Sequence, residues 1–90
     1  MIKVSSTTNS KYKYIKALMA KKARMQNREY TVEGIKSVSD AINSGADIKI
    51  IAVSESFFEN NNFRCPEGVE LIIVSDAIFE PLCDTKLHKV

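Results

Sequence analysis

The sequence predicts an α/β fold, a three-layer α/β/α sandwich around a small, mostly parallel sheet. Residues 48–53 and 69–74 form two nearly continuous apolar runs, which is typical of strands that helices cover on both faces. Residues 35–42 repeat apolar side chains at helical spacing just before the first run. Right-handed crossovers between such strands place helices on both faces of the sheet. A chain of 90 residues has room for one domain of this kind.

The first part of the chain is predicted to be a flexible segment followed by a long helix. Residues 1–8 are polar and rich in Ser and Thr, so we expect them to be flexible. Thr8 or Asn9 should cap the helix, because a side-chain oxygen there accepts from the first free N–H groups. The helix should run over residues 10–25. Its apolar side, which should pack on the sheet, holds Ile15, Leu18 and Met25.

A short strand is predicted directly before the second helix. Residues 30–32 are aromatic or β-branched, which suits a pleated surface. Gly34 has no Cβ, so the chain can turn sharply there into a helix over residues 35–44. Gly45 is expected to end that helix.

Two more short helices are expected, one after each apolar run. Ser54 is the predicted N-cap of the first, and Ser75 begins the second. Two interpretations are open for Phe57 and Phe58, namely stacking on nucleic-acid bases and packing in the core, and we favour the core. The resulting order is α, β, α, β, α, β, α.

The composition excludes several classes of site. No apolar run approaches the roughly 20 residues that span a bilayer, and no signal peptide is visible, so we expect a cytoplasmic protein with no membrane partner. Cys65 and Cys83 are expected to be free thiols, although a disulfide between them stays open. His88 is the only histidine, which leaves no ligand set for a metal and no catalytic triad. We therefore predict no catalytic residue and no metal site in this chain.

Positive charge is concentrated at the start of the chain. Residues 1–28 contain eight basic side chains and no acidic one, whereas the rest contains five basic and eleven acidic side chains. In a continuous helix Lys13 and Arg24 are about three turns apart and share a face, with Lys16 and Lys21 beside them. A solvated surface is one interpretation of this face. We favour contact with a nucleic acid, because a face that serves solubility alone usually mixes charges of both signs.

Several short segments together resemble the N-terminal substrate-binding domain of SpoU/TrmH-type RNA 2′-O-ribose methyltransferases. The resemblance covers about residues 5–86. Its parts are Ser6-Thr7-Thr8-Asn9, Lys13, Leu18, Lys21-Lys22, Arg24, Tyr30-Thr31-Val32-Glu33-Gly34-Ile35-Lys36, Ala52-Val53-Ser54-Glu55, Val74-Ser75-Asp76-Ala77-Ile78-Phe79 and Asp84-Thr85-Lys86.

The resemblance implies a fold similar to ribosomal kink-turn RNA binders and a role in docking structured RNA, either rRNA or tRNA. In that family a separate knotted domain binds S-adenosylmethionine and transfers the methyl group, and the enzyme usually works as a dimer. We accordingly expect an RNA substrate-binding domain over residues 9–85. Residues 86–90 would be the tail where the link to a catalytic domain begins, and residues 87–90 depart from the family's pattern. This chain would hold no cofactor and perform no catalysis.

The resemblance and the basic helix together supply the candidate RNA-binding residues. The five basic ones would contact phosphates. For Glu33 and Gly34 a structural role is the favoured alternative, in which the Glu33 carboxylate caps the following helix or pairs with Arg24. The candidates are Asn9, Lys13, Lys16, Lys21, Arg24, Glu33, Gly34 and Lys36.

Two other functions stay open at this point. One is a stand-alone kink-turn RNA-binding protein, although that family places an Asn-Glu pair after the glycine and Ile35 follows Gly34 here. The other is a protein-interaction domain, in which the basic helix meets an acidic partner or the catalytic half of the same protein.

Overall fold

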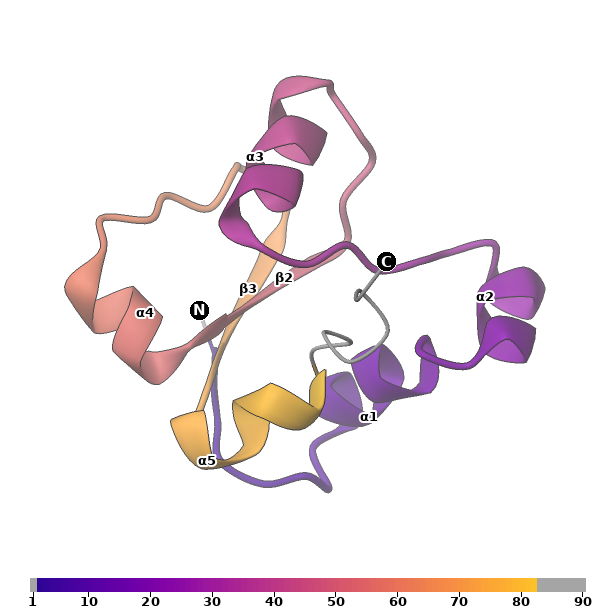
Figure 1. The fold of residues 1–90 in the computed structure, drawn as a ribbon, viewed down its shortest axis with the longest axis horizontal. Coiled ribbons are helices and arrows are strands. Elements are labelled where there is room, and N and C mark those ends of the chain that lie inside the picture. Colours follow the sequence, from indigo (N-terminus) through magenta and orange to yellow (C-terminus); the bar gives the residue numbers. More distant parts are fainter. Residues whose placement is uncertain (1, 83–90) are drawn as a thin grey trace.

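A three-stranded parallel sheet forms the middle of the fold (Figure 1). The computed structural model describes residues 2–82, apart from the side chain of Lys21. The strands are β1 (Ile2–Val4), β2 (Ile50–Ser54) and β3 (Glu70–Val74). Their order is β1-β3-β2, so β3 is the central strand and pairs in parallel with both neighbours. The predicted α/β class with a small parallel sheet is confirmed.

Helices cover both faces of this sheet. They are α1 (Ser10–Ala17), α2 (Lys21–Asn27), α3 (Ile35–Asn43), α4 (Glu55–Asn60), α5 (Asp76–Phe79) and the 3-10 helix η1 (Glu80–Leu82). Figure 1 shows α1 and α5 on one side of the strands and α3 and α4 on the other, with α2 at the periphery. The three layers are therefore those that the sequence predicts. No helix among the described residues has the length and apolar character needed to cross a membrane.

The core has two halves, one on each face of the central strand. Ile72 and Val74 of β3 are buried with Val4 and Tyr12 on the face covered by α1, α5 and η1. The alternate residues Leu71 and Ile73 belong to the other half, because successive side chains in a strand point to opposite faces. That second half holds Ile51, Val53, Leu71 and Ile73, with Val38, Ile42, Phe57, Phe58 and Phe63 packed against them.

One prediction about strands was wrong. Residues 30–32 form no strand, and Tyr30 and Val32 stay exposed, because strand propensity is realised only where a sheet offers a partner. The third strand is instead β1, within the segment 1–8 that was expected to be flexible. Three residues carry little pattern, and β1 depends on its pairing, in which Ile2 lies opposite Ile72 and Ser75 N–H donates to Val4 O at 2.9 Å.

The prediction of a single helix over residues 10–25 was also wrong, because this segment forms two helices, α1 and α2. Asn9 is the N-cap of α1, as expected: its Oδ1 accepts from Lys11 N at 2.9 Å and from Tyr12 N at 3.2 Å. The chain leaves the helix at Leu18, which is 4% exposed in the core, and Ala20 is extended. Met25, expected on the packing side, is 69% exposed.

Candidate nucleic-acid interface

The break between α1 and α2 changes the expected basic face. Lys13 and Lys16 lie on α1, whereas Lys21 begins α2 and Arg24 lies inside it. Lys13 is exposed, and Lys16 Nζ donates to Pro81 O at 2.9 Å. The alignment of Lys13 with Arg24 on one continuous helix is therefore absent. Their positive charges instead follow two short helices joined by a turn.

Arg24 has a structural role that the sequence did not indicate. Its Nη1 donates to Leu18 O at 2.9 Å and to Met19 O at 2.7 Å, so it satisfies carbonyl groups at the end of α1. These bonds hold α2 against the turn that precedes it. A guanidinium carries five N–H donors, so Arg24 retains donors for an anion as well.

Two ion pairs join the first 29 residues to residues in or directly before the strands β3 and β2. Lys11 Nζ lies 3.2 Å from Glu70 Oε2 at the beginning of β3. Lys49, just before β2, lies 2.7 Å from Glu29 Oε2 and over the ring of Tyr14, 5.8 Å from its centroid. The basic segment 1–28 thus finds one of its acidic partners far along the chain, where spacing within a helix does not reveal it.

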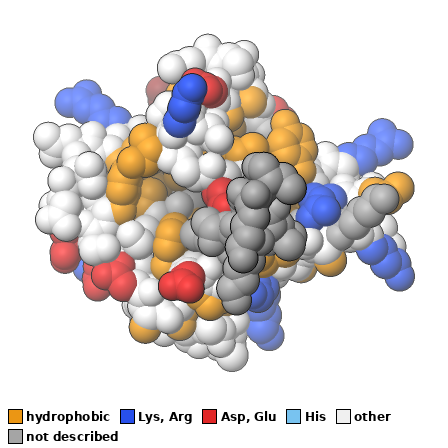
Figure 2. Space-filling view, viewed as in Figure 1, with side chains coloured by type: hydrophobic (Ala, Val, Ile, Leu, Met, Phe, Trp, Pro, Cys, Tyr) orange, Lys and Arg blue, Asp and Glu red, His pale blue; other side chains and the backbone are white. Residues whose placement is uncertain are grey.

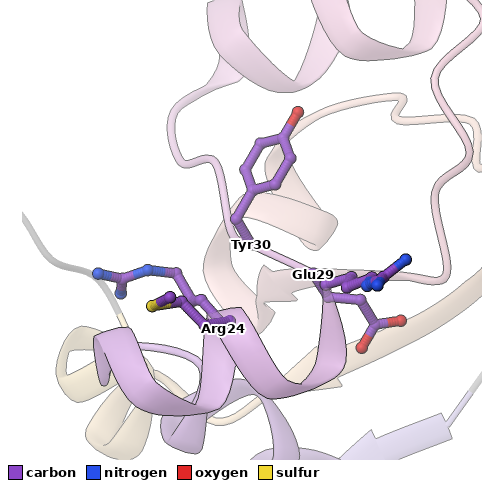
Figure 3. A pocket seen from close by; sticks show the side chains of 5 residues that line it. Arg24, Glu29 and Tyr30 are labelled. Atoms are coloured by element: carbon purple, nitrogen blue, oxygen red, sulfur yellow. The ribbon is translucent and has the colours of Figure 1, made fainter.

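An open groove of about 380 Å³ lies beside α2 and the segment that follows it. It is lined by Arg24, Met25, Arg28, Glu29 and Tyr30. In Figure 3 the ring of Tyr30 projects away from α2, while the Glu29 carboxylate points to the other side. Tyr30 is 76% exposed. Arg28 ends α2 in the left-handed conformation, with φ of 54°.

The structure separates the eight candidate residues rather than gathering them. Glu33, Gly34 and Lys36 lie at the start of α3, which packs on the face of the sheet opposite α1. Gly34 is the N-cap of α3 with φ of 92°, a conformation that side-chain-bearing residues rarely adopt. Nothing lies within 4 Å of a Cβ placed there, so the backbone angle alone accounts for the glycine. Asn9, by contrast, is committed to capping α1.

Charge is distributed unevenly over the surface. In Figure 2, several Lys and Arg side chains extend from the right-hand side, where α2 lies, and others from the upper left and the top. Acidic side chains gather at the lower left, near α4 and α5, and a few lie at the top and centre of the view. Residues 21–28 contribute four basic side chains and no acidic one. This concentration of one charge sign makes the side formed by α2 the candidate surface for a polyanion.

The cysteine and metal predictions concern residues that are only partly described. Cys65 Sγ donates to Val69 O at 3.3 Å, and burial raises the pKa of this thiol above its ordinary value. Cys83, His88 and the tail 86–90 lie outside the described residues. Within residues 2–82, no group of three or more His, Cys, Asp and Glu side chains is placed to hold a metal ion.

Comparison with known families identifies the domain. The sequence model of the MRM3-like substrate binding domain matches residues 9–87, which is most of the chain. The chain belongs to this family. Searches of curated proteins and of solved structures returned no match. The domain is thus a substrate-binding domain of an RNA methyltransferase, and RNA is the class of partner it implies.

The groove beside α2 is lined by two residues whose exposure the sequence did not predict. Met25 was assigned to the core and Tyr30 to a strand, yet both are exposed and line the groove together with Arg28. The available signal was the presence of an aromatic side chain within a few residues of two arginines. Phe57 and Phe58, weighed as stacking residues, pack against the core as favoured.

Proposed function

We propose that this domain docks structured RNA, rRNA or tRNA, for a 2′-O-ribose methyltransferase of the SpoU/TrmH type. Docking takes place on the basic surface of α1 and α2, defined by Lys13, Lys16, Lys22, Arg24 and Arg28. Lys21, the first residue of α2, is proposed as a further phosphate contact. The observation that carries the proposal is the absence of any acidic residue from the first 28 positions. A surface of one charge sign attracts the RNA backbone and releases its counterions on binding.

The positions of these residues support the proposal. Lys13 and Lys22 are exposed, and within residues 2–82 neither forms an ion pair with a carboxylate. Arg28 is exposed as well. Lys11, which does have a carboxylate partner, is left out of the surface. Lys36 lies at the start of α3, which packs on the opposite face of the sheet, and it is left out of the surface as well.

Methyl transfer in this proposal belongs to a separate catalytic domain of the same protein. That domain would bind S-adenosylmethionine and would form the dimer, in the cytoplasm. The groove beside α2 is open and carries two arginines, which suits a polyanion better than the sulfonium group of that cofactor. The part played by this chain is to bind and orient the RNA.

Salt-dependent RNA binding tests the proposal. The logarithm of the binding constant falls with the logarithm of salt concentration, with a slope of about 0.7 to 0.9 per phosphate contact. Lys13→Ala with Lys22→Ala should weaken binding of a structured rRNA or tRNA fragment by at least tenfold and reduce that slope by about 2. These two positions are chosen because Arg24→Ala would also disturb the end of α1.

The matched control removes the same charge elsewhere. Lys36→Ala with Arg64→Ala takes two exposed cations from α3 and from the segment before β3. This variant should bind RNA within about threefold of the unmodified chain, because its charges lie outside the basic surface. Equal losses for the two double variants would mean that net charge alone governs binding, and would overturn docking on α1 and α2.

A further inference from the structure

We propose that the groove beside α2 binds an unpaired nucleobase of the RNA substrate. Tyr30 supplies the stacking surface, and Arg24 and Arg28 contact the flanking phosphates. The inference rests on the proposed function, because it assigns a specific contact to the same basic surface. It also predicts that the domain prefers RNA with unpaired bases to a continuous duplex.

Tyr30 differs from every other described aromatic side chain. Tyr12 is buried and donates to Ile78 O at 2.8 Å, and Tyr14 lies under Lys49. The described phenylalanines are all partly buried. Tyr30 alone among the aromatic residues of 2–82 is exposed, and within that range it makes no hydrogen bond and no ring contact. An aromatic ring held away from the core presents its faces to a ligand.

The charges around the ring favour RNA as that ligand. Arg24 and Arg28 line the same groove. A planar guanidinium matches the geometry of a phosphate and can form two parallel hydrogen bonds with it. Glu29 also lines the groove, but its carboxylate is paired with Lys49 at 2.7 Å. The repulsion that Glu29 exerts on a phosphate is therefore reduced.

The shape of the groove suits a base presented on a strand. Its volume of about 380 Å³ leaves room for a planar base, and it is open to solvent rather than enclosed. Bases inside an RNA duplex are stacked and out of reach, whereas bases in loops and bulges can be splayed out onto an aromatic side chain. Stacking of this kind tolerates any base, because each has a π face.

A protein surface is the competing occupant. Met25, Tyr30, Val32 and Ile35 are exposed apolar side chains that extend from α2 to the start of α3, and such a patch also suits a protein partner. Two arginines in the groove and a family that acts on RNA favour the nucleobase. The experiment is therefore designed to separate the two occupants.

The test measures binding of the 90-residue chain to two probes. One is an RNA hairpin that carries 2-aminopurine in its unpaired loop, and the other is a fully paired duplex of the same length. Tyr30→Ala should weaken hairpin binding roughly tenfold, the loss expected for one base–aromatic stack. It should leave duplex binding and the salt slope unchanged, since no charge is removed. Tyr30→Phe should retain hairpin affinity and the change in 2-aminopurine fluorescence, whereas Tyr30→Leu should lose both.

Four outcomes would overturn the inference, and they differ in meaning. Hairpin affinity that is unchanged in Tyr30→Ala excludes the groove but leaves docking on α1 and α2 standing. Full affinity in Tyr30→Leu means that any apolar cover suffices, so no base is stacked. If Tyr30→Ala changes the self-association of the chain, measured by sedimentation velocity, and leaves RNA affinity unchanged, the exposed apolar side chains serve protein contact instead. Absence of RNA binding by the unmodified chain removes the proposed function as well.

Discussion

Lys49 and Glu29 form an ion pair of 2.7 Å that ties the segment after α2 to the residue just before β2. Lys49 also lies over the ring of Tyr14 in α1, 5.8 Å from its centroid. One cation therefore contacts two parts of the chain that are distant from it in sequence. Glu29 directly precedes Tyr30, and both line the groove. Lys49 is thus paired with the acidic side chain that lines the groove.

Glu29→Gln should raise RNA affinity with little effect on the fold. The change removes a negative charge from the groove and frees Lys49, so binding should strengthen a few-fold at low salt and show a steeper salt slope. Lys49 is 68% exposed and Glu29 24% exposed, so loss of the pair should lower the free energy of unfolding by less than about 1 kcal/mol. Binding titrations at several salt concentrations, with urea denaturation, check both parts. Weaker RNA binding would mean that Glu29 itself contacts the RNA.

Arg24→Ala should destabilise the domain by about 1 to 2 kcal/mol. Its Nη1 satisfies two carbonyl oxygens, Leu18 O and Met19 O, and hydrogen bonds from charged groups contribute more than neutral ones. Arg24 is only half-buried, so water replaces part of the loss. Urea denaturation measures the change, with Lys22→Ala as the control on the same helix. Equal stability of the two variants would show that the bonds from Nη1 contribute little.

Cys65 should make the stability of the domain fall at alkaline pH. Burial raises the pKa of its thiol in the folded state. Above the ordinary thiol pKa of about 8.5, the unfolded chain loses this proton while the folded chain keeps it, so the free energy of unfolding decreases as pH rises. Urea denaturation between pH 7 and pH 10, in a Cys83→Ser background, measures the decrease. Cys65→Ala in that background should show a smaller decrease, and an identical one would contradict the prediction.

The continuous apolar runs predicted β2 and β3, because a strand that is covered on both faces needs apolar side chains at nearly every position. Leu71, Ile72, Ile73 and Val74 illustrate this, since they alternate between the two halves of the core. The same reasoning failed for β1. Its three residues gain their place from β3, which lies some 70 positions away in the sequence, and no local pattern encodes that pairing.

The sequence shows the charge of the candidate surface but not its geometry. The count of basic residues places that candidate on the first 28 positions, and the structure divides it between two helices. The end of α1 at Leu18 could not be predicted from the sequence, because the residues around it favour a helix. The helix ends there where Leu18 packs in the core, and tertiary packing overrides helix propensity. Tyr30 was missed for a related reason, because a residue suited to a strand is exposed when the sheet has no place for it.

Arg28→Gly should separate stability from RNA binding. Arg28 ends α2 with φ of 54°, a left-handed conformation that costs a side-chain-bearing residue about 1 kcal/mol or more and that glycine adopts freely. Urea denaturation should therefore show equal or higher stability, by up to about 1 kcal/mol, while RNA affinity falls several-fold as a phosphate contact is lost. Arg28→Lys, the matched control, keeps both the charge and the conformational cost, so its stability should not change and its affinity should fall less. If Arg28→Gly bound RNA as tightly as the unmodified chain, then Arg28 would be only a helix terminus, and the phosphate contact assigned to it would be wrong.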